Sequence, residues 1–112
     1  MTPDYQAVLA ECSRARVRRS DNGLEPDDAR VFVLITKPRI AGPFQRVKIA
    51  SGLTGTIVSH GRFAARVELP VLDVEKWARG CIAHFEAYEK SGRDLERYTA
   101  PRCTSFMLED PR

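Results

Sequence analysis

Hydrophobic and polar positions follow two different periods along the chain, and together they predict two helices on either side of a β-rich segment. Near the N-terminus the apolar positions recur at helical spacing, on Tyr5, Val8, Leu9 and Cys12. Thr2 and Pro3 are residue types that commonly start a helix, which predicts a helix over residues 3–19. Arginines crowd its C-terminal end, where cations complement the helix dipole. They are Arg14, Arg16, Arg18 and Arg19.

A second stretch of helical periodicity is longer and more regular. Its apolar residues are Val74, Trp77, Ala78, Cys81, Ile82, Phe85 and Tyr88. Asp73 as a cap and Ser91-Gly92 as an end predict a helix over residues 73–90. Trp77 lies inside the apolar stripe, so we expect it in the core. The opposite face is expected to be solvated, with Glu75, Lys76, Arg79, Glu86 and Glu89.

Residues 29–69 have the pattern of β-strands. Val31 to Ile35 is a continuous apolar run, typical of a strand buried on both faces. From Gln45 onward apolar and cationic residues alternate, so that Val47 and Ile49 point one way and Arg46 and Lys48 the other. After an expected turn at His60-Gly61, the apolar set is Phe63, Ala65, Val67 and Leu69, and Arg62 and Arg66 alternate with it. If both strands join one sheet, their cations share a solvent-facing surface.

These elements define the expected architecture. We predict a single α+β domain, 1–112, with a small bent antiparallel sheet or an SH3-like barrel, flanked by an N-terminal and a C-terminal helix. Residues 93–112 lack sustained periodicity and are expected to be irregular, with a short edge strand within 103–108.

Composition narrows the class of protein. The chain of 112 residues is 43% hydrophobic and 29% charged, as in an ordinary globular domain. No apolar run approaches the ~18 residues of a membrane helix, and the N-terminus does not read as a signal peptide. The 3 cysteines, Cys12, Cys81 and Cys103, are widely spaced, as is usual in a reducing compartment. We therefore expect a cytoplasmic protein with no membrane partner.

The charge is distributed unevenly. Residues 29–67 hold seven cations and no carboxylate, whereas both flanking segments are net acidic. Such a field attracts polyanions or an acidic partner. Pairing of these cations with the acidic flanks across the fold would give the same sequence pattern.

The segment from Val47 to Val58, followed by a hairpin and Arg66-Val67-Glu68-Leu69, resembles a KOW-type segment. This motif belongs to small Src-homology-3-like barrels, in which a strand, a glycine turn and a second strand carry basic residues toward RNA, DNA or a protein. The resemblance covers residues 47–69 and implies a small barrel that is often associated with nucleic acid. The glycines Gly52 and Gly55 are expected at positions that need unusual backbone angles, within a turn over residues 52–55.

A catalytic or metal-binding set is hard to assemble from this sequence. Cys81 and His84 form a CxxH pair on the second helix, but a zinc site needs about four ligands. Cys81 also lies on the apolar stripe, where burial makes a thiol inert. Glu25, Asp27 and Asp28 lack the spacing of a calcium loop. We therefore expect no enzyme, no metal and no cofactor.

The leading hypothesis is a non-catalytic binding module whose basic sheet face contacts RNA or DNA through phosphates. The candidate residues are Lys37, Arg39, Phe44, Arg46, Lys48, Arg62 and Arg66. Phe44 is the only expected exposed aromatic for base stacking, because Phe63 is expected to point with the apolar set. One alternative is a small interaction or inhibitor module, of the type found in phages and mobile elements, that docks on an acidic protein surface. Another is a homodimer in which the basic face meets the acidic flanks of a second copy.

Overall fold

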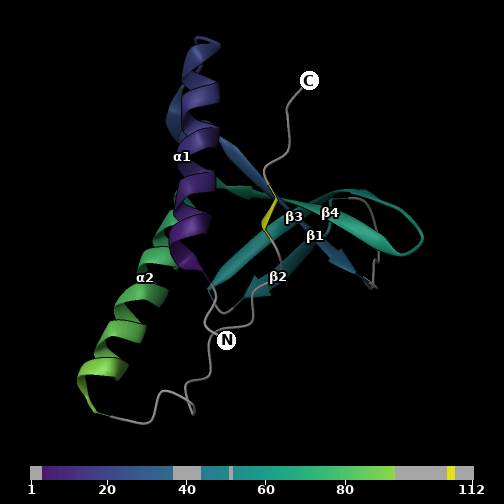
Figure 1. Ribbon diagram of the computed structural model, residues 1–112. Coiled ribbons are helices and arrows are strands. Elements are labelled where there is room, and N and C mark those ends of the chain that lie inside the picture. The colour runs from purple at the N-terminus through teal and green to yellow at the C-terminus, as the bar shows by residue number, and fades with distance from the viewer. Residues whose placement is uncertain (1–3, 37–43, 51, 93–105, 108–112) are drawn as a thin grey trace.

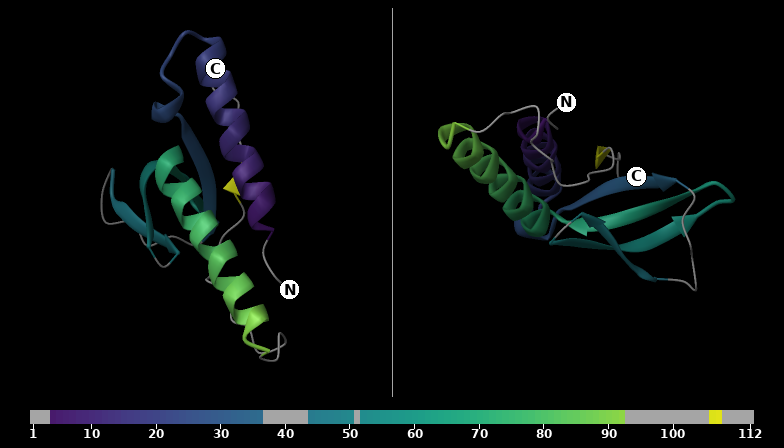
Figure 2. Two further views of the ribbon diagram at one scale, coloured as in Figure 1. Left: turned by 90° about the vertical axis from the view of Figure 1, so that its left-hand side faces the viewer. Right: turned by 90° about the horizontal axis from the view of Figure 1, so that it is seen from below.

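The computed structural model describes residues 4–36, 44–50, 52–92 and 106–107, and shows two helices packed on one side of an antiparallel sheet (Figures 1 and 2). The elements in chain order are α1 (Tyr5–Asp21), the short 3-10 helix η1 (Pro26–Asp28), β1 (Arg30–Thr36), β2 (Arg46–Ala50), β3 (Leu53–His60), β4 (Ala64–Pro70), α2 (Val71–Lys90) and β5 (Phe106–Met107). The expected α+β class with flanking helices is confirmed.

The sheet is open. Its strand order is β2-β3-β4-β1-β5, with every described pair antiparallel. The edges of β1 are occupied by β4 and β5, so that among the described strands β2 pairs with β3 alone. The alternative of a closed SH3-like barrel is therefore wrong.

Both helices lie close to their expected positions, but each begins at a different residue. Asp4 caps α1 by accepting a hydrogen bond from the Ala7 backbone N–H at 3.0 Å, and the expected cap at Thr2 lies outside the described residues. The second helix begins at Val71, and Pro70 rather than Asp73 is the residue before it. Because the Pro70 backbone has no N–H to donate, β4 ends and α2 begins there without a break.

The core lies between the helices and the sheet. Its largest fully buried side chains come from the strands and from both helices: Val33, Leu53, Ile57, Val67, Leu69, Val71, Val74 and, on α1, Cys12. Trp77 is buried as expected, and its ring meets that of Tyr5 edge-on, with centroids 5.6 Å apart. This aromatic contact joins the two helices.

The hairpin of β2 and β3 requires glycine at two positions, for different reasons. Ala50 pairs with Leu53, so the turn that contains Gly52 is shorter than expected, and Gly52 has a φ of +79°. Gly55 instead lies inside β3, where a Cβ would be 2.5 Å from Val67 Cγ1 and 2.9 Å from the Glu68 carbonyl oxygen. Close packing of β3 on β4, and not an unusual backbone angle, requires this glycine.

Candidate functional site

The strand register separates a core side of the sheet from a solvent side, which we call the outer face. Residues that alternate with the buried ones form it: Arg30, Phe32, Leu34, Arg46, Lys48, Thr54, Thr56, Arg66 and Glu68. Across the sheet, Arg46 lies opposite Thr56 and Thr56 opposite Glu68. Arg66 lies two residues before Glu68 on the same strand. The pairing therefore brings Arg46, Lys48 and Arg66 onto one face.

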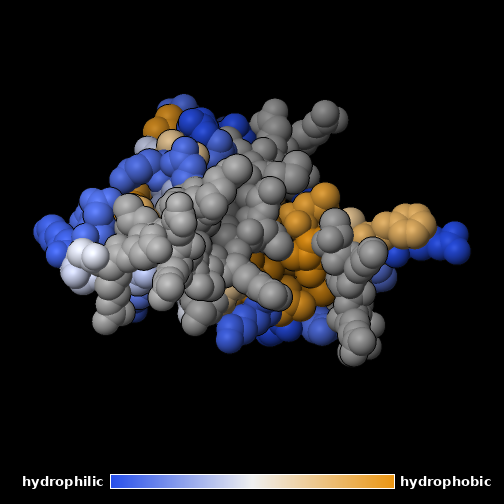
Figure 3. Space-filling model, turned by 60° about the horizontal axis from the view of Figure 1, so that its bottom comes forward, coloured by the Kyte–Doolittle hydropathy of each residue, from blue (hydrophilic) through white to orange (hydrophobic). Residues whose placement is uncertain are grey.

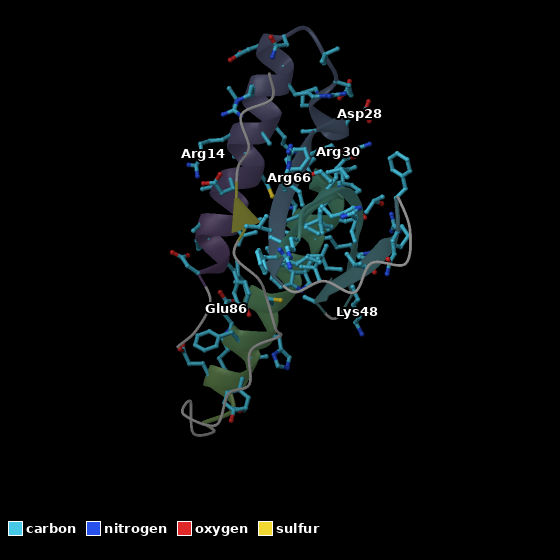
Figure 4. All side chains as sticks on the ribbon, turned by 90° about the vertical axis from the view of Figure 1, so that its right-hand side faces the viewer. Arg14, Asp28, Arg30, Lys48, Arg66 and Glu86 are labelled. Atoms are coloured by element: carbon cyan, nitrogen blue, oxygen red, sulfur yellow. The ribbon has the colours of Figure 1, made fainter. Side chains whose placement is uncertain are left out.

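Two of these cations are open to solvent. The Arg46 guanidinium donates from Nη1 to the Thr56 Oγ1 atom at 2.9 Å, and Lys48 projects away from β2 (Figure 4). Within residues 4–36, 44–50 and 52–92, no carboxylate forms an ion pair with Arg46, Lys48 or Arg62. The acidic segments on either side of residues 29–67 therefore do not neutralise these three charges within the described part of the chain.

The remaining charges of the outer face are partly satisfied within it. Arg30 pairs with Glu68, with 2.9 Å between Nε and Oε1, and also donates to the Asp28 carbonyl oxygen. Arg66 is half-buried, and its guanidinium carbon lies 4.9 Å from the centre of the Phe32 ring. This contact holds the arginine head close to the sheet.

Two aromatic rings near these cations are exposed to solvent. Phe63 is 73% exposed in the turn between β3 and β4, and the Arg62 guanidinium lies 5.6 Å from its ring centre. Phe44 is 74% exposed directly before β2. The Ile57 backbone N–H donates to the Gln45 carbonyl oxygen at 2.9 Å, which joins the start of β2 to the C-terminal half of β3. Figure 1 shows the β3–β4 hairpin reaching beyond the helices.

The position of Phe63 corrects two expectations. The turn spans residues 61–63, closed by a hydrogen bond from the Gly61 N–H to the Ala64 carbonyl oxygen, rather than His60-Gly61. Because β4 begins only at Ala64, Phe63 escapes the alternation that buries Ala65 and Val67. Phe44 is therefore not the only exposed aromatic near the cations. Lys37 and Arg39, the other expected site residues, lie outside the described residues.

At its helix end, the outer face meets a groove of about 530 Å³ between α2 and the β2–β3 hairpin. Arg46 and Thr54 line it from the sheet, and Lys76 and His84 line it from α2. Figure 3 shows that apolar and hydrophilic surface lie next to each other over the sheet. Arg46 is thus shared between the outer face and the groove.

A second group of charges, which the sequence analysis missed, lies between the helices. Arg16 of α1 donates to both carboxylate oxygens of Glu75, at 3.0 and 2.6 Å, and to Asp27 at 2.5 Å. Glu75 is only 7% exposed, so its expected place on the solvated face of α2 is wrong. These hydrogen bonds, above all those with Glu75, raise the pKa of Arg16. The signal for this pair was Ala15 and Arg16 continuing the buried stripe of α1 by one more turn.

Two cysteine thiols are buried in the described part of the chain, and one of them, Cys12, lies near this ion pair. Burial, and next the charge of Glu75, raises the pKa of Cys12 to about 11, and burial also raises the pKa of Cys81. Both thiols are thus protonated near neutral pH, which makes them poor nucleophiles. Across the described ranges, no three histidine, cysteine, aspartate or glutamate side chains gather as a metal site would require. Neither helix in the described part of the chain has the length and apolar character needed to cross a membrane.

Comparison with family models, curated proteins and solved structures finds no match to this chain.

Proposed function

We propose that the protein is a non-catalytic binding module whose outer face contacts nucleic acid through phosphates. One observation carries the proposal: Arg46 and Lys48, which lie on the same face as Arg66, are themselves exposed, and neither forms an ion pair with a described carboxylate. When exposed cations contact phosphates, they displace the counterions condensed on the nucleic acid, and this release supplies most of the affinity for its backbone.

The chemistry of these side chains suits phosphate groups. Arg46 uses one guanidinium nitrogen on Thr56, which orients the head and leaves its other donors for a ligand. Lys48 adds a mobile point charge on the same strand. The resemblance of residues 47–69 to a KOW segment, whose strands present basic residues to nucleic acid, points in the same direction. Such contacts fix position on a backbone and carry little base specificity.

The proposal is tested by fluorescence anisotropy with labelled DNA and RNA oligonucleotides of mixed sequence at about 50 and 200 mM salt. We expect binding at the lower salt that weakens strongly at the higher one. The double variant Arg46→Glu/Lys48→Glu is expected to weaken binding at least about tenfold, because it replaces attraction to phosphates by repulsion.

The matched control is Arg79→Glu/Lys90→Glu, which changes the net charge equally at exposed positions of α2. It is expected to have a much smaller effect, since a local surface and not total charge makes the contact. Equal losses in both variants, or no binding at about 50 mM salt, would contradict the proposal. The second result would favour the acidic protein partner instead.

A further inference from the structure

We infer that the preferred ligand is single-stranded nucleic acid, whose bases stack on Phe44 and Phe63 while its phosphates follow the cations of the outer face. This inference rests on the proposed function and goes further, because phosphate contacts alone do not distinguish a single strand from a duplex. Three observations support the inference: the two exposed rings, the backbone conformation of Phe44 and the groove beside α2.

The two rings are placed as stacking surfaces. Each is about three-quarters exposed, at 74% for Phe44 and 73% for Phe63, although burial would stabilise both. Each also has a cation at hand: Arg62 lies 5.6 Å from the Phe63 ring centre, and Arg46 follows Phe44 by two residues. Aromatic side chains that alternate with cations bind single strands, because every unstacked base offers a face to the ring.

The backbone at Phe44 adds an independent observation. Phe44 has a φ of +58°, in the left-handed region that is unfavourable for a bulky side chain. Among the described residues it is the one non-glycine residue with a positive φ. Strain of this kind is commonly retained at binding sites, where it presents a side chain to a ligand. At Phe44 this backbone conformation holds the phenyl ring in solvent, beside the outer face.

The path across the protein also suits a flexible strand. Arg46, two residues after Phe44, reaches the groove of about 530 Å³, which it lines together with Lys76 and Asp73 of α2, and Lys48 continues the row of cations along β2. A duplex keeps its bases stacked inside, so neither ring nor groove would reach a base face. A single strand can turn its bases toward both.

The test compares a fluorescein-labelled oligothymidine of about 12 nucleotides, alone and annealed to its complement, at about 50 mM salt. We expect the single strand to bind at least about tenfold tighter than the duplex. Phe63→Ala and Phe44→Gly are each expected to weaken single-strand binding by roughly 5- to 100-fold. Glycine is chosen at position 44 because it tolerates the positive φ, so that loss of the ring is separated from damage to the backbone.

The salt dependence separates stacking from charge. Both phenylalanine variants are expected to keep the wild-type slope of log affinity against log salt, since they remove no phosphate contact. Leu72→Ala, which removes an exposed apolar side chain from α2, is the matched control and is expected to bind as the wild type does. Duplex bound as tightly as single strand, with both phenylalanine variants unchanged, would overturn this inference and leave the proposed function standing. Binding of neither form would overturn both.

Discussion

Arginine plays opposite roles in two regions of this protein. Between the helices, Arg16 is held by both oxygens of Glu75 and by Asp27, so its charge is satisfied within the fold. On the outer face, Arg46 and Lys48 have no such partner among the described residues. The comparison separates cations that hold the structure together from cations that remain available to a ligand.

The surroundings of the two regions explain the difference. Glu75 lies in the helix interface, where an ion is stable only when it is paired and hydrogen-bonded. The outer face is solvated, so its cations can remain without an ion-pair partner and the protein still folds. Substitutions in the first region should therefore change stability, and substitutions in the second should change binding.

The largest effect is expected from Glu75→Ala. Removing this carboxylate leaves the partly buried Arg16 with Asp27 alone, and should lower the free energy of unfolding by about 3 kcal/mol. Urea unfolding followed by circular dichroism measures the change. The double variant Arg16→Met/Glu75→Leu is expected to recover most of the loss, because it leaves no unpaired charge. A loss below about 0.5 kcal/mol for Glu75→Ala would mean that the ion pair has no structural role.

The next effect concerns Cys12, which lies near the same ion pair. Burial and Glu75 raise the pKa of its thiol from 9.0 to about 11, so the unfolded chain loses this proton at lower pH than the folded one. The contribution is fully present below pH 9 and is lost as the pH rises to 11, by between about 2 and 3 kcal/mol. Unfolding curves at pH 8, 9, 10 and 11 should show this fall in the wild type and a shallower fall in Cys12→Ala. Parallel curves would contradict it.

Gly55→Ala should have a somewhat smaller effect, within the sheet that supports the outer face. The added Cβ would meet Val67, Leu69 and the Glu68 carbonyl oxygen at 2.5 to 2.9 Å, and we expect a loss of about 2 kcal/mol. Gly80→Ala is the matched control, because nothing lies within 4 Å of its Cβ on α2. It should stabilise the helix by about 0.5–1 kcal/mol. Thermal unfolding measures this difference: the unfolding temperature should fall in Gly55→Ala and rise in Gly80→Ala.

The sequence was sufficient to predict elements in which one period extends over many residues. The helical stripe through Trp77 and the alternation of Arg46 and Lys48 with Val47 and Ile49 both lie as periodicity indicates. These patterns are local consequences of burying one face of an element.

Features that depend on distant parts of the chain were not predictable in this way. The pairing of Arg16 with Glu75 joins residues that are 59 positions apart, and local periodicity assigned Glu75 to solvent. The exposure of Phe63 depends on where the β3–β4 turn closes, because a shift of a residue or two changes which side chains follow the alternation. The open sheet likewise follows from the pairing of β1 with β4, a contact that no local pattern encodes.

The most direct test of the central claim is the slope of log affinity for a nucleic acid against log salt, compared between the wild type and Arg46→Ala/Lys48→Ala. If these two cations each neutralise a phosphate, the slope of the double variant should be shallower by about 1.5. Its free energy of unfolding should stay within about 0.5 kcal/mol of the wild type, since both side chains are exposed. An unchanged slope in a folded variant would contradict the account, because the phosphate contacts would then lie on another surface.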